Sequence, residues 1–314
     1  MTAKSGLVEQ KRRERLATWL DEEVEKILAE KKGGSQENRL AKFKEWVEEM
    51  EARHGKGKGR SNFDVPELWR SWYYLRQGYH LGKPRRASHR HWQGGEMQHR
   101  GAKCYVCRRP LALLWDIDCT DPRFRRESPD LFKGLERLPL YYCCRCPSPT
   151  IYRCTAPGRI TVLPVERRTS EESPFEDVPE FFPRHPLVLD PIPSDIENLI
   201  QLTEWLGFDW LHQSDRRALA KYFGESSTWV EVRRSQFGGI PALEQGHSEI
   251  PCPNLRCPTH SWGDPFGRHD EYFQMKELAV IEDDANFEME TSCAQIIFHI
   301  CWACQTIHAE YGID

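Results

Sequence analysis

Cys104-Tyr-Val-Cys107 and Cys143-Cys-Arg-Cys146 form one set of closely spaced cysteine pairs in this chain, and Cys252-Pro-Asn-Leu-Arg-Cys257 and Cys301-Trp-Ala-Cys304 form a second. A pair with this spacing presents two sulfurs from one tight turn, and two pairs supply the four soft ligands that Zn²⁺ prefers. The sequence therefore predicts two structural zinc ions, one for each set.

The two pairs of each set lie far apart along the chain. There are 35 residues between Cys107 and Cys143, and 43 between Cys257 and Cys301. We therefore expect each ion to clamp β segments that are distant in sequence. Four thiolates fill the coordination sphere and leave no position for water, which argues against catalysis at these sites.

The composition and the cysteine pattern are typical of a reducing compartment. The 314 residues are 39% hydrophobic and 29% charged, with a net charge of −4 and a mean hydropathy of −0.69. The charged stretch from Met1 to Leu20 lacks the apolar run of a signal peptide, and no run is long enough to span a membrane. We expect a cytoplasmic protein, in which paired cysteines favour metal over disulfides. The spare cysteines are expected to be buried, with Cys144 or Cys154 as substitute ligands of the first site: Cys119, Cys144, Cys154 and Cys293.

The chain divides into four segments by composition, and the fold class that they predict is α+β. Residues 1–53 carry apolar residues at helical spacing on both sides of Gly33-Gly34, which predicts a helical hairpin arm. Residues 54–168 combine a basic aromatic stretch with the first zinc-binding β unit, and residues 169–193 form an acidic, proline-rich connection. Residues 194–314 hold helices and the second β unit. We therefore expect a β-rich body that contains zinc ribbons, in which the second β unit could be a duplicate of the first.

Local patterns place individual elements within these segments. Helices are expected over residues 66–78, 194–207 and 214–223. Strands are expected over residues 111–117, 138–143, 151–154, 160–165 and 294–300.

Residues 54–103 are strongly basic, with eleven Lys or Arg against three acidic residues. Seven aromatic residues are interspersed among them, which is how single-strand nucleic-acid sites combine charge with stacking. The alternative is a core helix flanked by a solvated basic loop. The candidate nucleic-acid contacts are Lys56, Lys58, Arg60, Arg85, Arg86 and Arg90.

The order of motifs around the cysteines resembles the YwqG-like family of unknown function, which is related to programmed cell death protein 2. Phe237-Gly-Gly-Ile-Pro241 precedes Cys252, and Phe298-His-Ile-Cys301 closes the second unit. In the first unit Gly94-Gly-Glu-Met97 replaces the Gly-Gly-x-Pro turn. The resemblance covers about residues 94–314 and implies a duplicated β-rich fold that binds a protein client during ribosomal protein handling.

Three functions are compatible with these observations. The first is a zinc-stabilised, non-enzymatic protein-interaction or chaperone-like module, whose partner surface is the basic aromatic stretch or the acidic proline-rich segment. The second is nucleic-acid binding through residues 54–103. The third is a zinc-dependent hydrolase or deaminase in which His299, His308 and Glu310 act with the second cysteine set, although the order of its H-x-E and C-x2-C parts is reversed relative to zinc deaminases. The common hydrolase and nucleotide-binding motifs are missing, and nothing indicates a membrane or a small-molecule substrate.

Overall fold

The computed structural model describes residues 74–82, 90–127, 131–132, 134–146, 148–165, 181–206, 208, 211, 213–225, 230–243, 250–257, 275–282 and 295–312. The predicted helical hairpin of residues 1–53 lies outside these ranges. The chain divides into two compact units, of which one comprises Met1–Arg70 with Asn198–Val230 and the other Ser71–Glu197 with Glu231–Asp314. Both sheets belong to the second unit.

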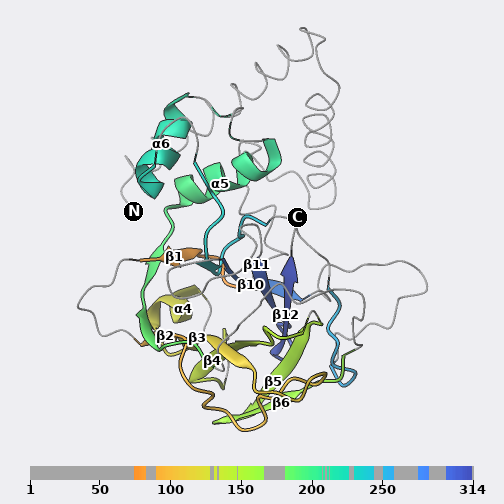
Figure 1. Ribbon diagram of the computed structural model, residues 1–314. Helices are drawn as coiled ribbons and strands as arrows, with labels where there is room; N and C mark the ends of the chain where they lie inside the picture. Colours follow the sequence, from red (N-terminus) through yellow and green to blue (C-terminus); the bar gives the residue numbers. More distant parts are fainter. Residues whose placement is uncertain are drawn as a thin grey trace, which may run out of the picture. The chain divides into compact units, whose positions relative to one another are not determined.

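The described elements alternate short strands with a few helices (Figure 1). The strands are β1 (Tyr79–Leu81), β2 (His91–Gln93), β3 (Ala112–Asp118), β4 (Arg137–Tyr142), β5 (Thr150–Ala156), β6 (Arg159–Val162), β7 (His185–Leu187), β8 (Leu189–Pro191), β9 (Gln236–Phe237), β10 (Lys276–Ile281), β11 (Gln295–Ile300) and β12 (Thr306–Gly312). The helices are α4 (Pro122–Glu127), α5 (Ser194–Leu206) and α6 (Gln213–Phe223). The α+β, β-rich class predicted from the sequence is confirmed.

Within the described residues all strand pairs are antiparallel, and they form two sheets. One sheet has eight strands in the order β6-β5-β12-β11-β10-β9-β1-β8, and the other has four in the order β4-β3-β2-β7. In the larger sheet β5, from the first half of the sequence, pairs with β12, from the second half. The two cysteine-bearing halves therefore share one sheet, and they are parts of a single β body.

Two predictions about local structure are wrong within the described residues. The helix expected over residues 66–78 is not continued from Tyr74 to Gly78, where the chain bends and then enters β1. The expected connection of residues 169–193 contains β7, which pairs with β2, and β8, which pairs with β1. Proline is tolerated there because β7 and β8 are each the last strand of a sheet, where one side of the backbone needs no ladder bonds.

One apolar core contains buried side chains from both sheets. Trp115 of β3, Leu140 of β4, Tyr152 of β5 and Phe298 of β11 are completely buried in the same cluster. The Tyr152 hydroxyl donates a hydrogen bond of 2.7 Å to the carbonyl of Pro139 and accepts one of 2.8 Å from the Tyr141 amide. Because β4 and β5 belong to different sheets, this buried hydroxyl ties the sheets together while satisfying its own hydrogen-bonding needs.

The same order of elements occurs twice. β2, a Gly-Gly pair, a cysteine pair, the antiparallel strands β3 and β4, a cysteine pair and β5 follow one another in the first half, with α4 between β3 and β4. β9, a Gly-Gly pair, a cysteine pair, the antiparallel strands β10 and β11, a cysteine pair and β12 follow in the second half. The order of pairing β4-β3-β2 in one sheet corresponds to β11-β10-β9 in the other.

The two Gly-Gly pairs make equivalent hydrogen bonds. The Gly94 amide donates to the carbonyl of Leu114, and the Gly238 amide donates to that of Leu278, each at 2.7 Å. Both carbonyls belong to the residue that bulges out of register in its strand, β3 or β10. All four glycines have positive φ, from +62° to +109°, which other residues adopt only with strain. The first turn keeps this geometry although Met97 stands where the second turn has Pro241.

Candidate metal centres

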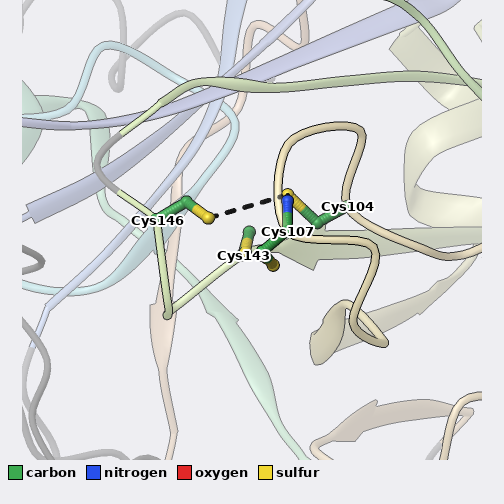
Figure 2. A group of neighbouring side chains, drawn as sticks. All are labelled: Cys104, Cys107, Cys143 and Cys146. Atoms are coloured by element: carbon green, nitrogen blue, oxygen red, sulfur yellow. Dashed lines mark hydrogen bonds between the residues drawn. The ribbon is translucent and has the colours of Figure 1, made fainter. Parts of the chain in front are cut away.

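The first cysteine set converges at one end of the β3–β4 hairpin (Figure 2). Cys104 and Cys107 lie in the loop that leads into β3, and Cys143 directly follows β4. The sulfurs of Cys104 and Cys146 are 3.9 Å apart, and those of Cys107 and Cys143 are 3.7 Å apart. We call these four residues the first tetrad.

The loop of the first pair is shaped by its own backbone. The Arg108 amide donates to the Cys104 carbonyl at 3.0 Å, and the Cys104 amide donates to the carbonyl of Arg109 at 2.9 Å. Arg108 has φ of +62°, so the chain reverses immediately after the second cysteine. The Cys107 amide also points at the Cys104 sulfur, 3.5 Å away. This tight turn is the reason that a two-residue spacing can offer both sulfurs to one ion.

The second cysteine set forms an equivalent cluster, the second tetrad. The sulfurs of Cys252 and Cys304 are 3.6 Å apart, as are those of Cys257 and Cys301. Cys301 follows β11 directly, just as Cys143 follows β4. The turn of Cys301 repeats the one at Cys104, with the Gln305 amide donating to the Cys301 carbonyl at 2.8 Å and φ of +54° at Gln305.

Two polar residues that the sequence did not single out contact the second tetrad. The side-chain amide of Asn254 donates to the Cys304 sulfur at 3.5 Å, and the Thr306 hydroxyl lies 3.0 Å from the same sulfur. Such contacts orient a thiolate and stabilise its charge. Asn254 stands between Cys252 and Cys257, and this position in the ligand loop is the sequence signal that could have identified it.

The sulfur positions of both tetrads fit a tetrahedral metal ion. A Zn–S bond of about 2.3 Å places the sulfurs of a tetrahedron about 3.8 Å apart. The four sulfur–sulfur distances given above run from 3.6 to 3.9 Å, and all four sulfurs of each tetrad lie within 4.8 Å of one another. A disulfide needs a sulfur separation of about 2.05 Å, so these contacts are not disulfides. Both predicted groupings are therefore brought together, and each could hold a metal ion.

The sulfurs within a tetrad also change one another's acidity. A hydrogen bond from Cys143 lowers the pKa of Cys104 to about 5, and hydrogen bonding from Cys252 holds the pKa of Cys304 well below its usual range. Hydrogen bonding to Cys104 raises the pKa of Cys143, and hydrogen bonding to Cys301 and Cys304 raises that of Cys252, so each cluster favours the thiolate at one sulfur and the thiol at another.

The spare cysteines lie outside the tetrads where they are described. Cys119 and Cys144 are buried, and burial raises the pKa of Cys144 to about 12. Cys154 is half-buried in β5, and burial raises its pKa to about 11. Neither Cys144 nor Cys154 belongs to the group of four sulfurs in the first tetrad, so neither substitutes for a ligand there. Cys293 lies outside the described residues.

The histidines and the acidic residue of the enzyme hypothesis also come together, but separately from the sulfurs. The ligand atoms of His299, His308 and Glu310 all lie within 4.8 Å of one another. The second tetrad already has four sulfur ligands. The geometry therefore does not favour the predicted site in which these three residues share one ion with the second cysteine set.

The basic residues predicted to contact nucleic acid are mostly outside the described ranges. This applies to Lys56, Lys58, Arg60, Arg85 and Arg86. Arg90 is exposed, yet its guanidinium lies 3.8 Å from the Asp118 carboxylate and donates to the Thr120 hydroxyl at 3.3 Å. Its charge is partly offset by this neighbouring acid, so Arg90 by itself adds little to a basic surface, and nucleic-acid binding stays a prediction.

No helix in the described part of the chain combines the length and the apolar character needed to cross a membrane. Comparison of the chain with models of protein families, with curated proteins and with solved structures gives no match. The family resemblance therefore stays a prediction that rests on the motifs.

Proposed function

We propose that this protein is a zinc-stabilised, non-enzymatic module that binds an apolar segment of a client protein at the loops of its second tetrad. The observation that carries the proposal is that the loops holding the four sulfurs also present large apolar side chains to solvent. Leu255 is 67% exposed and Trp302 is 48% exposed.

Zinc is the ion that suits both tetrads best. Four cysteine ligands at tetrahedral spacing are typical of structural Zn²⁺ sites, and thiolates disfavour hard ions such as Mg²⁺ and Ca²⁺. All eight cysteines are buried or half-buried. A closed set of four ligands leaves no coordination position for a substrate, which supports a structural role at these two sites.

The metal would make the exposed side chains a suitable binding surface. Leu255 lies between Cys252 and Cys257, and Trp302 lies between Cys301 and Cys304. Coordination fixes both loops before a partner arrives, so less conformational entropy is lost on binding. Tryptophan in a rigid setting is also among the side chains that contribute most to protein interfaces.

The repeated order of elements supports the family resemblance and hence the class of partner. In both halves a Gly-Gly turn, a cysteine pair, two antiparallel strands and a second cysteine pair follow one another in the same order along the chain. This is the arrangement expected of a duplicated zinc-ribbon body. The resemblance to the YwqG-like family implies binding of a protein client during ribosomal protein handling, so the proposed client is a protein chain.

The test compares the proteins captured by the tagged chain with those captured by variants at exposed apolar positions. Leu255→Ser with Trp302→Ser removes the proposed surface, while Phe181→Ser is a matched control because Phe181 is 49% exposed in the acidic proline-rich segment. We expect a defined client that the wild type and the control retain and the double variant loses, with unchanged zinc content in all three. A client set that is identical for all three proteins, or that depends on Phe181 alone, would refute the proposed surface.

A further inference from the structure

β11 is buried on both sides, and its two faces differ in chemistry. Ile296, Phe298 and Ile300 point into the main apolar core. Because side chains alternate along a strand, Ile297 and His299 lie on the opposite face. His299 is only 1% exposed there, so a residue that can bind a metal or a proton is buried deep in the sheet.

The register of the larger sheet brings further polar residues to this face. His308 of β12 pairs directly with His299, and Glu277 of β10 pairs with His299 from the other side. Glu310 lies two residues beyond His308 and therefore on the same face. Residues that face each other on neighbouring antiparallel strands have Cβ atoms about 5 Å apart, which is within reach of a shared ion.

The side chains of these residues also turn toward one another. The two imidazole rings of His299 and His308 have centroids 6.1 Å apart, and the ligand atoms of these histidines and Glu310 lie within 4.8 Å of one another. Coordination of a tetrahedral ion at about 2.1 Å needs ligand atoms about 3.4 Å apart, so side-chain rotations alone can close the set.

We propose that His299, His308 and Glu310 form a third metal site, separate from both tetrads, which takes Zn²⁺ through two imidazole nitrogens and one carboxylate oxygen. Imidazole and carboxylate ligands suit divalent transition metals, and three protein ligands leave one position of a tetrahedral ion for water or a small anion. This site therefore differs from the closed tetrads in having an open position.

One neighbouring residue and the exposure of the ligands favour this assignment. Glu277 is 3% exposed and directly opposite His299, where its carboxylate can accept a hydrogen bond from the ring nitrogen that does not bind the ion. A metal-bound histidine usually has such a partner, which fixes its tautomer and orientation. Glu310 is half-buried, while His308 is 8% exposed, so Glu310 is the more solvent-accessible of these two ligands.

The experiment uses the reduced full-length chain with both tetrads filled by Zn²⁺, to which Co²⁺ is added as the probe. We expect one further equivalent of Co²⁺ per chain, with the visible d–d absorption of a four-coordinate ion and without sulfur-to-metal charge transfer. Glu310→Gln, at a half-buried position that tolerates an isosteric change, should weaken Co²⁺ binding at least about tenfold, because loss of a ligand costs no less than loss of its supporting partner. His185→Ala, at a half-buried histidine in β7, is the control and should bind Co²⁺ as the wild type does.

Three outcomes would overturn the proposal. They are binding of no Co²⁺ beyond the zinc-filled tetrads, equal affinity in the wild type and Glu310→Gln, and charge-transfer absorption that places the added Co²⁺ on sulfur. The two tetrads and the client surface are unaffected by any of these results, so failure here is distinguishable from failure of the proposed function.

Discussion

The free energy of unfolding should depend on the free zinc concentration with a slope that counts the ions held by the tetrads. Unfolding separates Cys104 and Cys107 from Cys143 and Cys146, and it separates the pairs of the second tetrad in the same way. An ion that binds only the folded chain stabilises it by about 1.4 kcal/mol for every tenfold rise in free ion once its site is saturated.

The expected slope follows from the architecture. Both tetrads lie in the same compact unit and flank strands of one shared core, so we expect them to be lost in one transition. Two saturated sites then give about 2.7 kcal/mol per tenfold change in free zinc. The proposed third site has three protein ligands rather than four, so we expect it to bind zinc more weakly than the tetrads. It would add about 1.4 kcal/mol per tenfold rise in free zinc, and only at higher free zinc concentrations.

The assay is urea unfolding under reducing conditions in a series of zinc buffers, applied to the wild type and two variants at adjacent buried cysteines. Cys143→Ala should reduce the slope at low free zinc to about 1.4 kcal/mol, because one tetrad is lost. Cys144→Ala should lower the stability at every zinc concentration but keep the slope of the wild type, since Cys144 is buried but lies outside the first tetrad.

A slope near zero in the wild type would refute the reasoning, because it would mean that the fold does not depend on metal. A slope of one ion would show that one tetrad does not bind. An equal effect of Cys143→Ala and Cys144→Ala on the slope would show that the ligands of the first tetrad are wrongly assigned.

Two further predictions concern the β body. Gly94 and Gly158 have nearly the same φ, +66° and +65°, but a Cβ at Gly94 would overlap the carbonyl oxygen of Pro183, whereas nothing lies within 4 Å of one at Gly158. Gly158→Ala should therefore cost about 1 kcal/mol and Gly94→Ala about 3 kcal/mol in urea unfolding, and equal losses would contradict the close approach. Burial raises the pKa of Glu197 from 4.5 to about 7, so its protonated form contributes stability that is complete below pH 4.5 and is lost as the pH rises to 7. In Glu197→Gln, the free energy of unfolding should fall by about 3 kcal/mol less than in the wild type over this pH range. If the free energies of unfolding of the two proteins instead change in parallel from pH 4.5 to pH 8, the raised pKa of the buried carboxyl is refuted.

The sequence was most informative where the relevant geometry is local. A two-residue spacing between cysteines already implies a tight turn with two sulfurs on one side, and each such turn forms as expected at Cys104 and Cys301. The strands expected over residues 111–117 and 138–143 and the helix expected from residue 194 are present, because alternation and capping patterns act over a few residues. The division of the eight cysteines into two tetrads could also be predicted, because each tetrad needs two pairs and is formed by two pairs that are consecutive along the chain.

The features that sequence reasoning missed depend on pairing between distant strands. Nothing local distinguishes Pro186 in β7 or Pro191 in β8 from prolines of a connection, since only their partners at the sheet edges make them strand residues. The position of Glu277 opposite His299, which the sequence did not indicate, also depends on register, because a shift of one residue would move each side chain to the other face. The amino-acid sequence by itself thus determined the sulfur-bearing turns and the β-rich class. Only the tertiary structure decided which strands lie side by side, because the free energy of sheet pairing comes from burial and hydrogen bonds shared between segments that no local pattern links.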